Sequence, residues 1–190
     1  MSDLDKARLD WIDRNHYSQG QTVDVVEEDE VGRGYLRFIL QEGETALRFK
    51  LSEKGRFPCI AQRKAADGVV LQFSAGKKLQ AIHLVELKSK LSISEWTKVK
   101  LQLQGALHNA HALLGVLGLN WPDKVICHTA YKQDAVSTNP ALMKQPMGQH
   151  LAQIDGADWV EGKIAIDQHF SRLEHHRHQR DASGNAEVIL

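Results

Sequence analysis

The chain has little cysteine, no net charge and no apolar run long enough to cross a membrane. Its two cysteines, Cys59 and Cys127, are too few for a disulfide framework or a cysteine-based zinc site. Both lie among apolar residues in the sequence, where we expect them to be small buried side chains. The N-terminus shows no basic and apolar signal sequence. We therefore expect a soluble protein of the reducing cytoplasm that does not contact a membrane.

The absence of net charge limits how the chain can bind a polyanion. Lysine and arginine number 24, as do aspartate and glutamate. A domain that holds nucleic acid unaided usually carries an excess of positive charge. Either the basic residues cluster on one surface, or a partner protein contributes to binding. Hydrophobic residues make up 42% of the 190 residues, which is enough for one globular domain with a proper core, and no internal repeat is visible.

The stretch from Asp67 to Lys88 carries the most informative pattern. Two apolar runs flank a short turn at Gly76-Lys77. Read as a β-hairpin, the turn places Asp67 directly opposite Glu86 on the neighbouring strand. Alternation places Lys88 on the same face as Glu86, at the charged end of an otherwise apolar surface. Two carboxylates and a lysine are therefore predicted to lie side by side, and the apolar face opposes any slip of this register.

These residue types suit a magnesium site that acts on phosphate esters. Magnesium takes oxygen ligands in octahedral geometry and keeps several waters. Asp67, Glu86 and the backbone carbonyl of Leu87 would supply such ligands and leave room for a phosphate and an attacking water. Lys88 would orient the nucleophile or stabilise the charged transition state. The alternative is a Glu86–Lys88 ion pair near a strand end, a common surface feature of little energetic consequence.

The segment from Phe57 to Ser89 resembles the core of the PD-(D/E)xK, or restriction-endonuclease-like, nuclease superfamily. It is most similar to compact members found in prokaryotic defence and mobile-element contexts. In that family an aspartate begins the second core strand, an acidic-x-lysine motif lies on the third strand, and a helix follows. Asp67, Glu86 and Lys88 are the matching positions. The resemblance covers residues 45–130.

The resemblance implies both a fold and an activity. The fold would be α+β, with a mixed sheet and helices on its faces, in one domain made of an N-terminal helix and strands (1–44), a catalytic core (45–131) and a C-terminal extension (132–190). The activity would be that of a Mg²⁺- or Mn²⁺-dependent endonuclease that cuts nucleic acid, DNA in preference to RNA. Such a protein would act as an effector in defence against foreign nucleic acid, with a protein partner or as a homodimer.

A long helix is predicted to follow the motif. The sequence from Ser92 matches a capping box, an apolar stripe recurs at three- and four-residue spacing, and Gly118 ends it. Gln102 borders this stripe, and similar nucleases often place a glutamine from this helix beside the metal. A simple boundary glutamine is the equally weighted alternative. His108 and His111 face outward, so a solvated helix surface is expected there.

Other charged residues around the motif are candidates for the site. Arg63 and Lys64 precede the aspartate and Lys90 follows the lysine, so all three could contact phosphates, although a solvated loop is the usual role of such residues. Members of the family often carry an additional acidic residue upstream. Glu44 and the run from Glu27 to Glu30 are the candidates for it, and the sequence does not choose between them.

The C-terminal run from Arg172 to Arg180 concentrates histidine and arginine. It could be a metal-binding tract, a nucleic-acid arm or a pH-sensitive contact. The interpretation we favour is a polar terminal helix or tail that contacts a neighbour or nothing. The remaining predicted elements are a short helix over 3–15, strands over 22–26, 34–40, 46–51, 57–61 and 125–131, a helix over 140–154 interrupted by a proline, and an edge strand over 162–168.

Two further functions stay open beside the nuclease. The chain could be a non-catalytic subunit that keeps the nuclease fold and serves as a binding or scaffold module. It could also be a histidine-based metal protein that uses the C-terminal cluster, although that cluster has no familiar ligand spacing.

Overall fold

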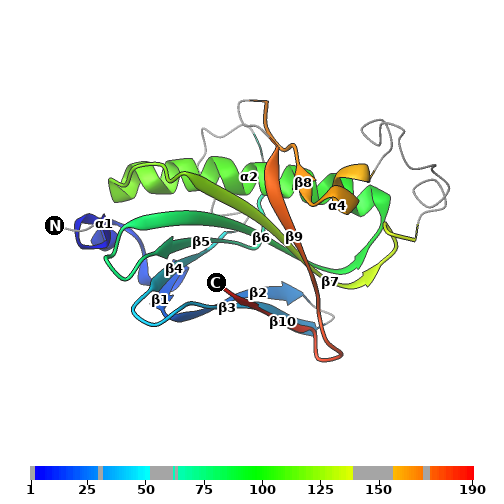
Figure 1. Ribbon diagram of the computed structural model, residues 1–190, viewed down its shortest axis with the longest axis horizontal. Helices are drawn as coiled ribbons and strands as arrows, with labels where there is room; N and C mark the ends of the chain where they lie inside the picture. The colour runs from blue at the N-terminus through cyan, green and yellow to red at the C-terminus, as the bar shows by residue number, and fades with distance from the viewer. Residues whose placement is uncertain (1–2, 30–31, 52–61, 63, 139–155, 169–171) are drawn as a thin grey trace.

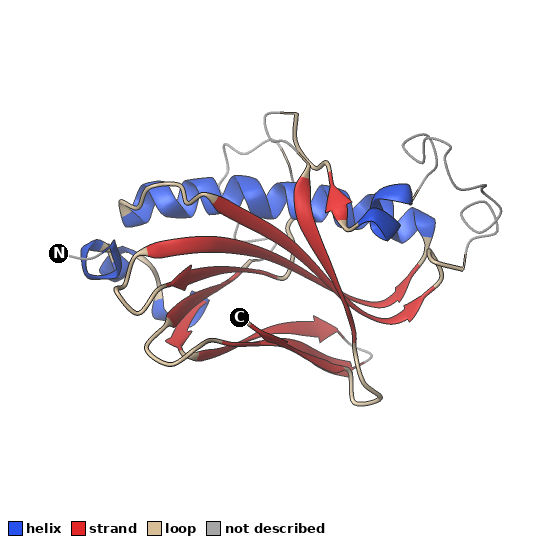
Figure 2. Ribbon diagram, in the orientation of Figure 1, coloured by secondary structure: helices blue, strands red, loops and turns tan. Residues whose placement is uncertain are grey.

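The computed structural model describes residues 3–29, 32–51, 62, 64–138, 156–168 and 172–190, and its elements form three layers (Figure 1). A seven-stranded sheet is the middle layer. The long helix α2 (Ile93–Leu117) lies along one of its faces, and a three-stranded sheet covers the other (Figure 2). The prediction of an α+β chain with a mixed sheet is confirmed. The second sheet was not predicted.

The large sheet combines an antiparallel meander with parallel strands. Its order is β1-β4-β5-β6-β7-β9-β8. Strands β4, β5 and β6 are antiparallel neighbours, whereas β7 runs parallel to β6 after the crossover through α2, and β9 runs parallel to β7. The bounds are β1 Tyr17–Gly20, β4 Thr45–Lys50, β5 Gly68–Phe73, β6 Leu79–Leu91, β7 Lys124–Asp134, β8 Lys163–Ile164 and β9 Leu173–Gln179.

The small sheet contains two strands from the N-terminal part of the sequence and one from its C-terminal end. Strands β2 (Thr22–Asp29) and β3 (Gly32–Ile39) form an antiparallel pair, and β10 (Asn185–Ile189) adds to β3 in parallel. The short helix α4 (Ala157–Glu161) leads into the edge strand β8. The described part of the chain contains no helix with the length and apolar character needed to cross a membrane.

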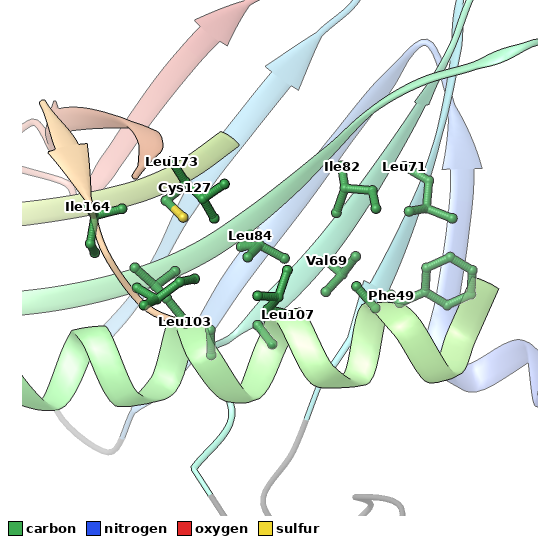
Figure 3. Packing of buried hydrophobic residues seen from close by; sticks show 14 of the residues in the cluster. Phe49, Val69, Leu71, Ile82, Leu84, Leu103, Leu107, Cys127, Ile164 and Leu173 are labelled. Carbon is green, nitrogen blue, oxygen red and sulfur yellow. The ribbon is translucent and has the colours of Figure 1, made fainter. Parts of the chain in front are cut away.

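Two hydrophobic clusters hold the layers together, one on each face of the large sheet. Toward α2, Val69 and Leu84 pack with Leu107 of the helix (Figure 3). Toward the small sheet, Val70 and Val85 pack with residues of β2 and β3. Successive side chains of one strand therefore enter the clusters on opposite faces of the sheet. This explains why the sequences of β5 and β6 are nearly continuous apolar runs.

The predicted hairpin register is confirmed. Gly68 pairs with Val85 and Leu71 with Ile82, and a β-bulge lies close to the turn. The predicted helix is also confirmed: the hydroxyl of Ser92 accepts a hydrogen bond from the N–H of Glu95, and Gly118 adopts the left-handed conformation at the C-cap.

Most of the other predicted strands are confirmed. Those over 22–26, 34–40, 46–51 and 125–131 correspond to β2, β3, β4 and β7. The edge strand predicted over 162–168 is present as the shorter β8, and Cys127 is buried as expected. The predicted strand over 57–61, Cys59 and the predicted helix over 140–154 lie outside the described residues.

The prediction of one helix over 3–15 is wrong. The segment contains α1 (Asp3–Lys6) and two short 3-10 turns, Leu9–Trp11 and Arg14–His16. Two of its backbone donors bond to other elements: the N–H of Leu4 donates to the carbonyl of Lys77 at 3.1 Å, and that of Arg8 donates to the carbonyl of Leu117 at 3.1 Å. Short isolated helices are marginal, so these tertiary hydrogen bonds decide the conformation.

The favoured interpretation of the C-terminal run, a polar helix or tail, is also wrong. Residues 173–179 form β9, an interior strand between β7 and β8. Leu173 and His175 are buried on the α2 side, whereas Glu174, His176 and His178 alternate with them. Polar side chains concealed this alternation, because strand patterns are normally recognised from apolar residues.

Two glycines of α2 give a matched test of this packing. A Cβ atom on Gly105 would lie 1.7 Å from the backbone carbonyl oxygen of Lys64, whereas one on Gly115 would have no atom within 4 Å. We expect Gly105→Ala to lower the free energy of unfolding by about 1–3 kcal/mol through this clash. Gly115→Ala should raise it by about 0.5–1 kcal/mol through helix propensity. Urea denaturation of both variants measures the difference, and equal effects would contradict the described packing of the segment ahead of Asp67.

Candidate functional site

Asp67 immediately precedes β5. Continuing the β5–β6 pairing by one residue beyond Gly68 and Val85 places Asp67 directly across from Glu86. Its Oδ2 atom accepts a hydrogen bond of 2.7 Å from the N–H of Leu87. Strand β5 begins only at Gly68, so no β5 carbonyl accepts a hydrogen bond from the N–H of Leu87. The carboxylate of Asp67 accepts it instead. The carbonyl of Leu87 points to the same edge of β6 as its N–H group, toward Asp67.

Glu86 is buried beneath α2 and is paired with Lys88. Only 1% of its side chain is exposed, and its Oε1 atom lies 2.6 Å from Nζ of Lys88, which is 22% exposed. Its Oε2 atom is buried and has no hydrogen-bond partner among the described residues. The ion pair that was the alternative interpretation therefore exists, but it is not an exposed surface pair. A buried carboxylate oxygen without a partner is costly and calls for an explanation.

Burial and mutual repulsion govern the protonation of the two acids. Burial raises the pKa of Asp67 to about 6, although the N–H of Leu87 and the charge of Lys88 act to lower it. Burial and the nearby charge of Asp67 raise the pKa of Glu86 well above its ordinary value. Burial alone would lower the pKa of Lys88, but Glu86 and Asp67 raise it overall. The cluster holds more negative charge than one lysine neutralises.

Glu27 of β2 belongs to the same cluster. Its charge raises the pKa of both Asp67 and Glu86, so its carboxylate lies within electrostatic range of both. Its Oε2 atom lies 2.6 Å from Nη1 of Arg180, whose side chain is fully buried. The Nε and Nη2 atoms of Arg180 have no hydrogen-bond partner among the described residues. Arg180 was not a predicted site residue, because a tail was expected there.

Glu44, the other upstream candidate, lies toward the opposite end of the hairpin. Its Oε2 atom accepts a hydrogen bond of 3.2 Å from Nε2 of Gln72, five residues along β5 from Asp67. The structure therefore brings Glu27, and not Glu44, to the pair of carboxylates.

Among the described residues, no hydrogen bond connects Gln102 with Asp67 or Glu86. The helix instead contacts the segment ahead of Asp67 through Gln104, whose Oε1 atom accepts a hydrogen bond of 3.1 Å from Nε2 of Gln62. The same segment packs across the helix at the adjacent Gly105.

The predicted phosphate contacts differ in their positions. Lys64 and Lys90 are exposed, whereas Arg63 lies outside the described residues. Nε2 of His108 lies 3.2 Å from Oδ2 of Asp167, and the ring of His111 stacks on that of Trp121, with the ring centroids 3.7 Å apart.

A row of histidines crosses the other face of the large sheet, beside Phe38 of the small sheet. Nδ1 of His83 lies 2.9 Å from Nε2 of His128, and Nδ1 of His128 lies 2.9 Å from Nε2 of His178. His176 is the register partner of His128 on β9. His83 and His128 were missed as functional candidates. Their positions on the same face of two predicted strands could have identified them.

A cavity of about 710 Å³ lies near the turn of the hairpin, away from Asp67. It is lined by residues that include Gln72, His83, Lys78, Trp121 and Lys124. Ser74, at the hairpin turn, also borders it, so the cavity and the carboxylates occupy opposite ends of β5 and β6.

Comparisons of this chain with protein-family models, with curated proteins and with solved structures return no match. Any functional proposal therefore depends on the geometry of the described side chains.

The raised pKa of Asp67 predicts a pH-dependent effect of Asp67→Asn. A carboxyl whose pKa rises from 3.8 to about 6 on folding holds its proton more tightly in the folded state. The free energy of unfolding therefore falls as the pH rises through this range and stays lower above it. We expect the variant to be more stable than the wild type by roughly 1–2 kcal/mol at pH 8. The difference should vanish near pH 4, where the wild-type carboxyl is already neutral.

Urea denaturation at the two pH values measures the effect. Asp123→Asn, which alters an exposed carboxylate, is the control and should show no such change with pH. A variant that is less stable than the wild type at pH 8 would contradict the description of Asp67 as a carboxylate whose ionised form is disfavoured by burial.

Proposed function

We propose that the protein is a Mg²⁺- or Mn²⁺-dependent phosphodiesterase that cuts nucleic acid at the cluster of Asp67, Glu86 and Lys88. One observation carries the proposal: Glu86 is buried opposite Asp67 with one oxygen unpartnered, and both carboxyl groups have raised pKa values. A divalent cation would relieve this excess of negative charge. Structural ion pairs are usually arranged to neutralise one another, which this cluster does not do.

The ligand set fits a hard cation. Asp67, Glu86 and the carbonyl of Leu87 offer only oxygen atoms, the ligands that magnesium prefers. When bound, such a cation lowers the pKa of a coordinated water and neutralises charge on the phosphate. Ionised Asp67 and Glu86 would hold it, and Glu27 adds negative charge nearby.

Lys88 would exchange its partner if a divalent cation were bound. Its ammonium group now neutralises Oε1 of Glu86 at 2.6 Å. With a cation on that carboxylate, Lys88 would be released to donate hydrogen bonds to a phosphate oxygen or to orient the attacking water. Its partial exposure leaves a route to substrate, which Glu86 itself does not have.

The topology around these residues supports the proposal. Asp67 precedes β5, Glu86 and Lys88 lie on β6, α2 follows, and β7 returns parallel to β6. The resemblance to PD-(D/E)xK nucleases implies an aspartate at the start of one strand, an acidic-x-lysine motif on the next strand and a helix after it. The preference for DNA, the role in defence and the partner or homodimer rest on that resemblance and on the lack of net charge.

A second function is favoured by one observation. Glu86 is 1% exposed and already paired with Lys88, so the site is closed as it stands. A non-catalytic binding or scaffold module would keep such a pair without opening it.

A cleavage assay with a matched pair of lysine variants separates these functions. Plasmid DNA, single-stranded DNA and RNA are incubated with the protein in Mg²⁺, in Mn²⁺ or in EDTA. We expect metal-dependent cutting that falls by about a hundredfold or more in Glu86→Gln and in Lys88→Met. Lys163→Met alters the chain's other acidic-x-lysine sequence, whose lysine is exposed, and should cut like the wild type.

Two results would contradict the nuclease. One is equal cutting by the wild type and Lys88→Met. The other is the absence both of cutting and of any Mg²⁺ binding that Glu86→Gln removes, which would leave the scaffold module.

A further inference from the structure

We propose that His128, His176 and His178 form a second metal site, specific for a zinc-class divalent cation and separate from the carboxylates. Each residue has one ring nitrogen that lies within 4.8 Å of a ring nitrogen of each of the other two. His128 is contributed by β7, and His176 and His178 by β9. A bound cation would therefore join two parallel neighbouring strands, the fifth and sixth in the order of the seven-stranded sheet.

The spacing suits tetrahedral coordination. Zinc–nitrogen bonds measure about 2.0–2.1 Å, so two imidazole nitrogens on one tetrahedral ion lie about 3.3 Å apart. Nδ1 of His128 and Nε2 of His178 are 2.9 Å apart, with a shared proton in place of a cation. The planes of the two rings are nearly parallel, with an interplanar angle of 18°. A small opening of this contact would admit the ion, and three histidines would leave a fourth position for water.

A chain of hydrogen bonds decides which nitrogen of His128 is free to bind. Nε2 of Gln72 donates to Glu44, so its Oε1 accepts the proton of Nε2 of His83 at 3.2 Å. Nδ1 of His83 must then accept, at 2.9 Å, from Nε2 of His128. Nδ1 of His128 is left with its lone pair toward His178. Partners of this kind, on the far side of a ligating imidazole, fix its tautomer and orientation.

The chemistry of the ligand atoms also fits, since all three residues offer imidazole nitrogens. Imidazole nitrogens suit zinc, whereas magnesium prefers oxygen, so the two sites should select different ions.

The site also has a structural connection with the carboxylates. Arg180 follows His178 by two residues and holds Glu27 at 2.6 Å. The N–H of Arg180 donates to the carbonyl of Tyr131 on β7 at 2.7 Å. A cation that joins β7 to β9 would thus hold the strand that positions Arg180.

Metal titration of the full chain, without an affinity tag and after EDTA treatment, tests the proposal. We expect one Zn²⁺ per chain by elemental analysis, and Co²⁺ should give the visible absorption of a tetrahedral nitrogen site. His176→Asn and His178→Asn alter partly exposed residues and should each weaken Zn²⁺ binding by about a hundredfold or more. His16→Asn, at an exposed histidine outside the row, and Asp67→Asn should bind like the wild type.

A further variant tests the hydrogen bonds from Gln72 through His83 to His128. His83→Gln leaves all three ligands in place and should weaken Zn²⁺ binding by about ten- to a hundredfold. Failure of the wild type to bind Zn²⁺ stoichiometrically, or binding that His176→Asn and His178→Asn do not weaken, would overturn the site. Loss of binding in Asp67→Asn would instead place the ion at the carboxylates. None of these results depends on nuclease activity.

Discussion

Strands β5 and β6 pair in a single register, and the positions of the acidic side chains depend on it. Each strand has a hydrophobic core on both faces, so a slip of one residue would exchange the side chains that face α2 with those that face the small sheet. Such an exchange would bring His83 and Leu87 beneath the helix and remove Glu86 from it. Packing energy spread over both strands thus places Asp67 opposite Glu86.

The cluster at the end of this hairpin is unfavourable as a purely structural feature. The buried carboxyl group of Glu86 and the half-buried one of Asp67 share one lysine, and Glu27 adds negative charge that Arg180 offsets from within the protein. Replacing buried ion pairs with apolar residues is often neutral or stabilising. A site that costs stability and leaves buried polar atoms unpartnered is typical of functional residues. The row of histidines on the other face is different, because its members hydrogen-bond to one another in sequence from Gln72 to His178.

Features that depend on neighbouring residues were predictable from the sequence, and those that depend on distant ones were not. The hairpin register and α2 follow from a turn, an apolar alternation and a capping serine. Arg180 and Glu27 are 153 residues apart, and nothing local indicates that they meet. Gln102 was chosen from its place on a helical surface, but the segment ahead of Asp67 crosses α2 at Gln104 and Gly105. The alternation in β9 was obscured because a histidine, His175, occupies one of its two buried positions.

The position of a bound Mn²⁺ ion is the most direct test of the central claim, that Asp67 and Glu86 form a metal site. Anomalous scattering from crystals soaked in Mn²⁺ would locate the ion without any need for activity. We expect a peak between the carboxylates of Asp67 and Glu86, beside the carbonyl of Leu87, with Lys88 moved away from Glu86. An ordered Mn²⁺ ion found elsewhere, with the Glu86–Lys88 pair intact, would contradict the claim.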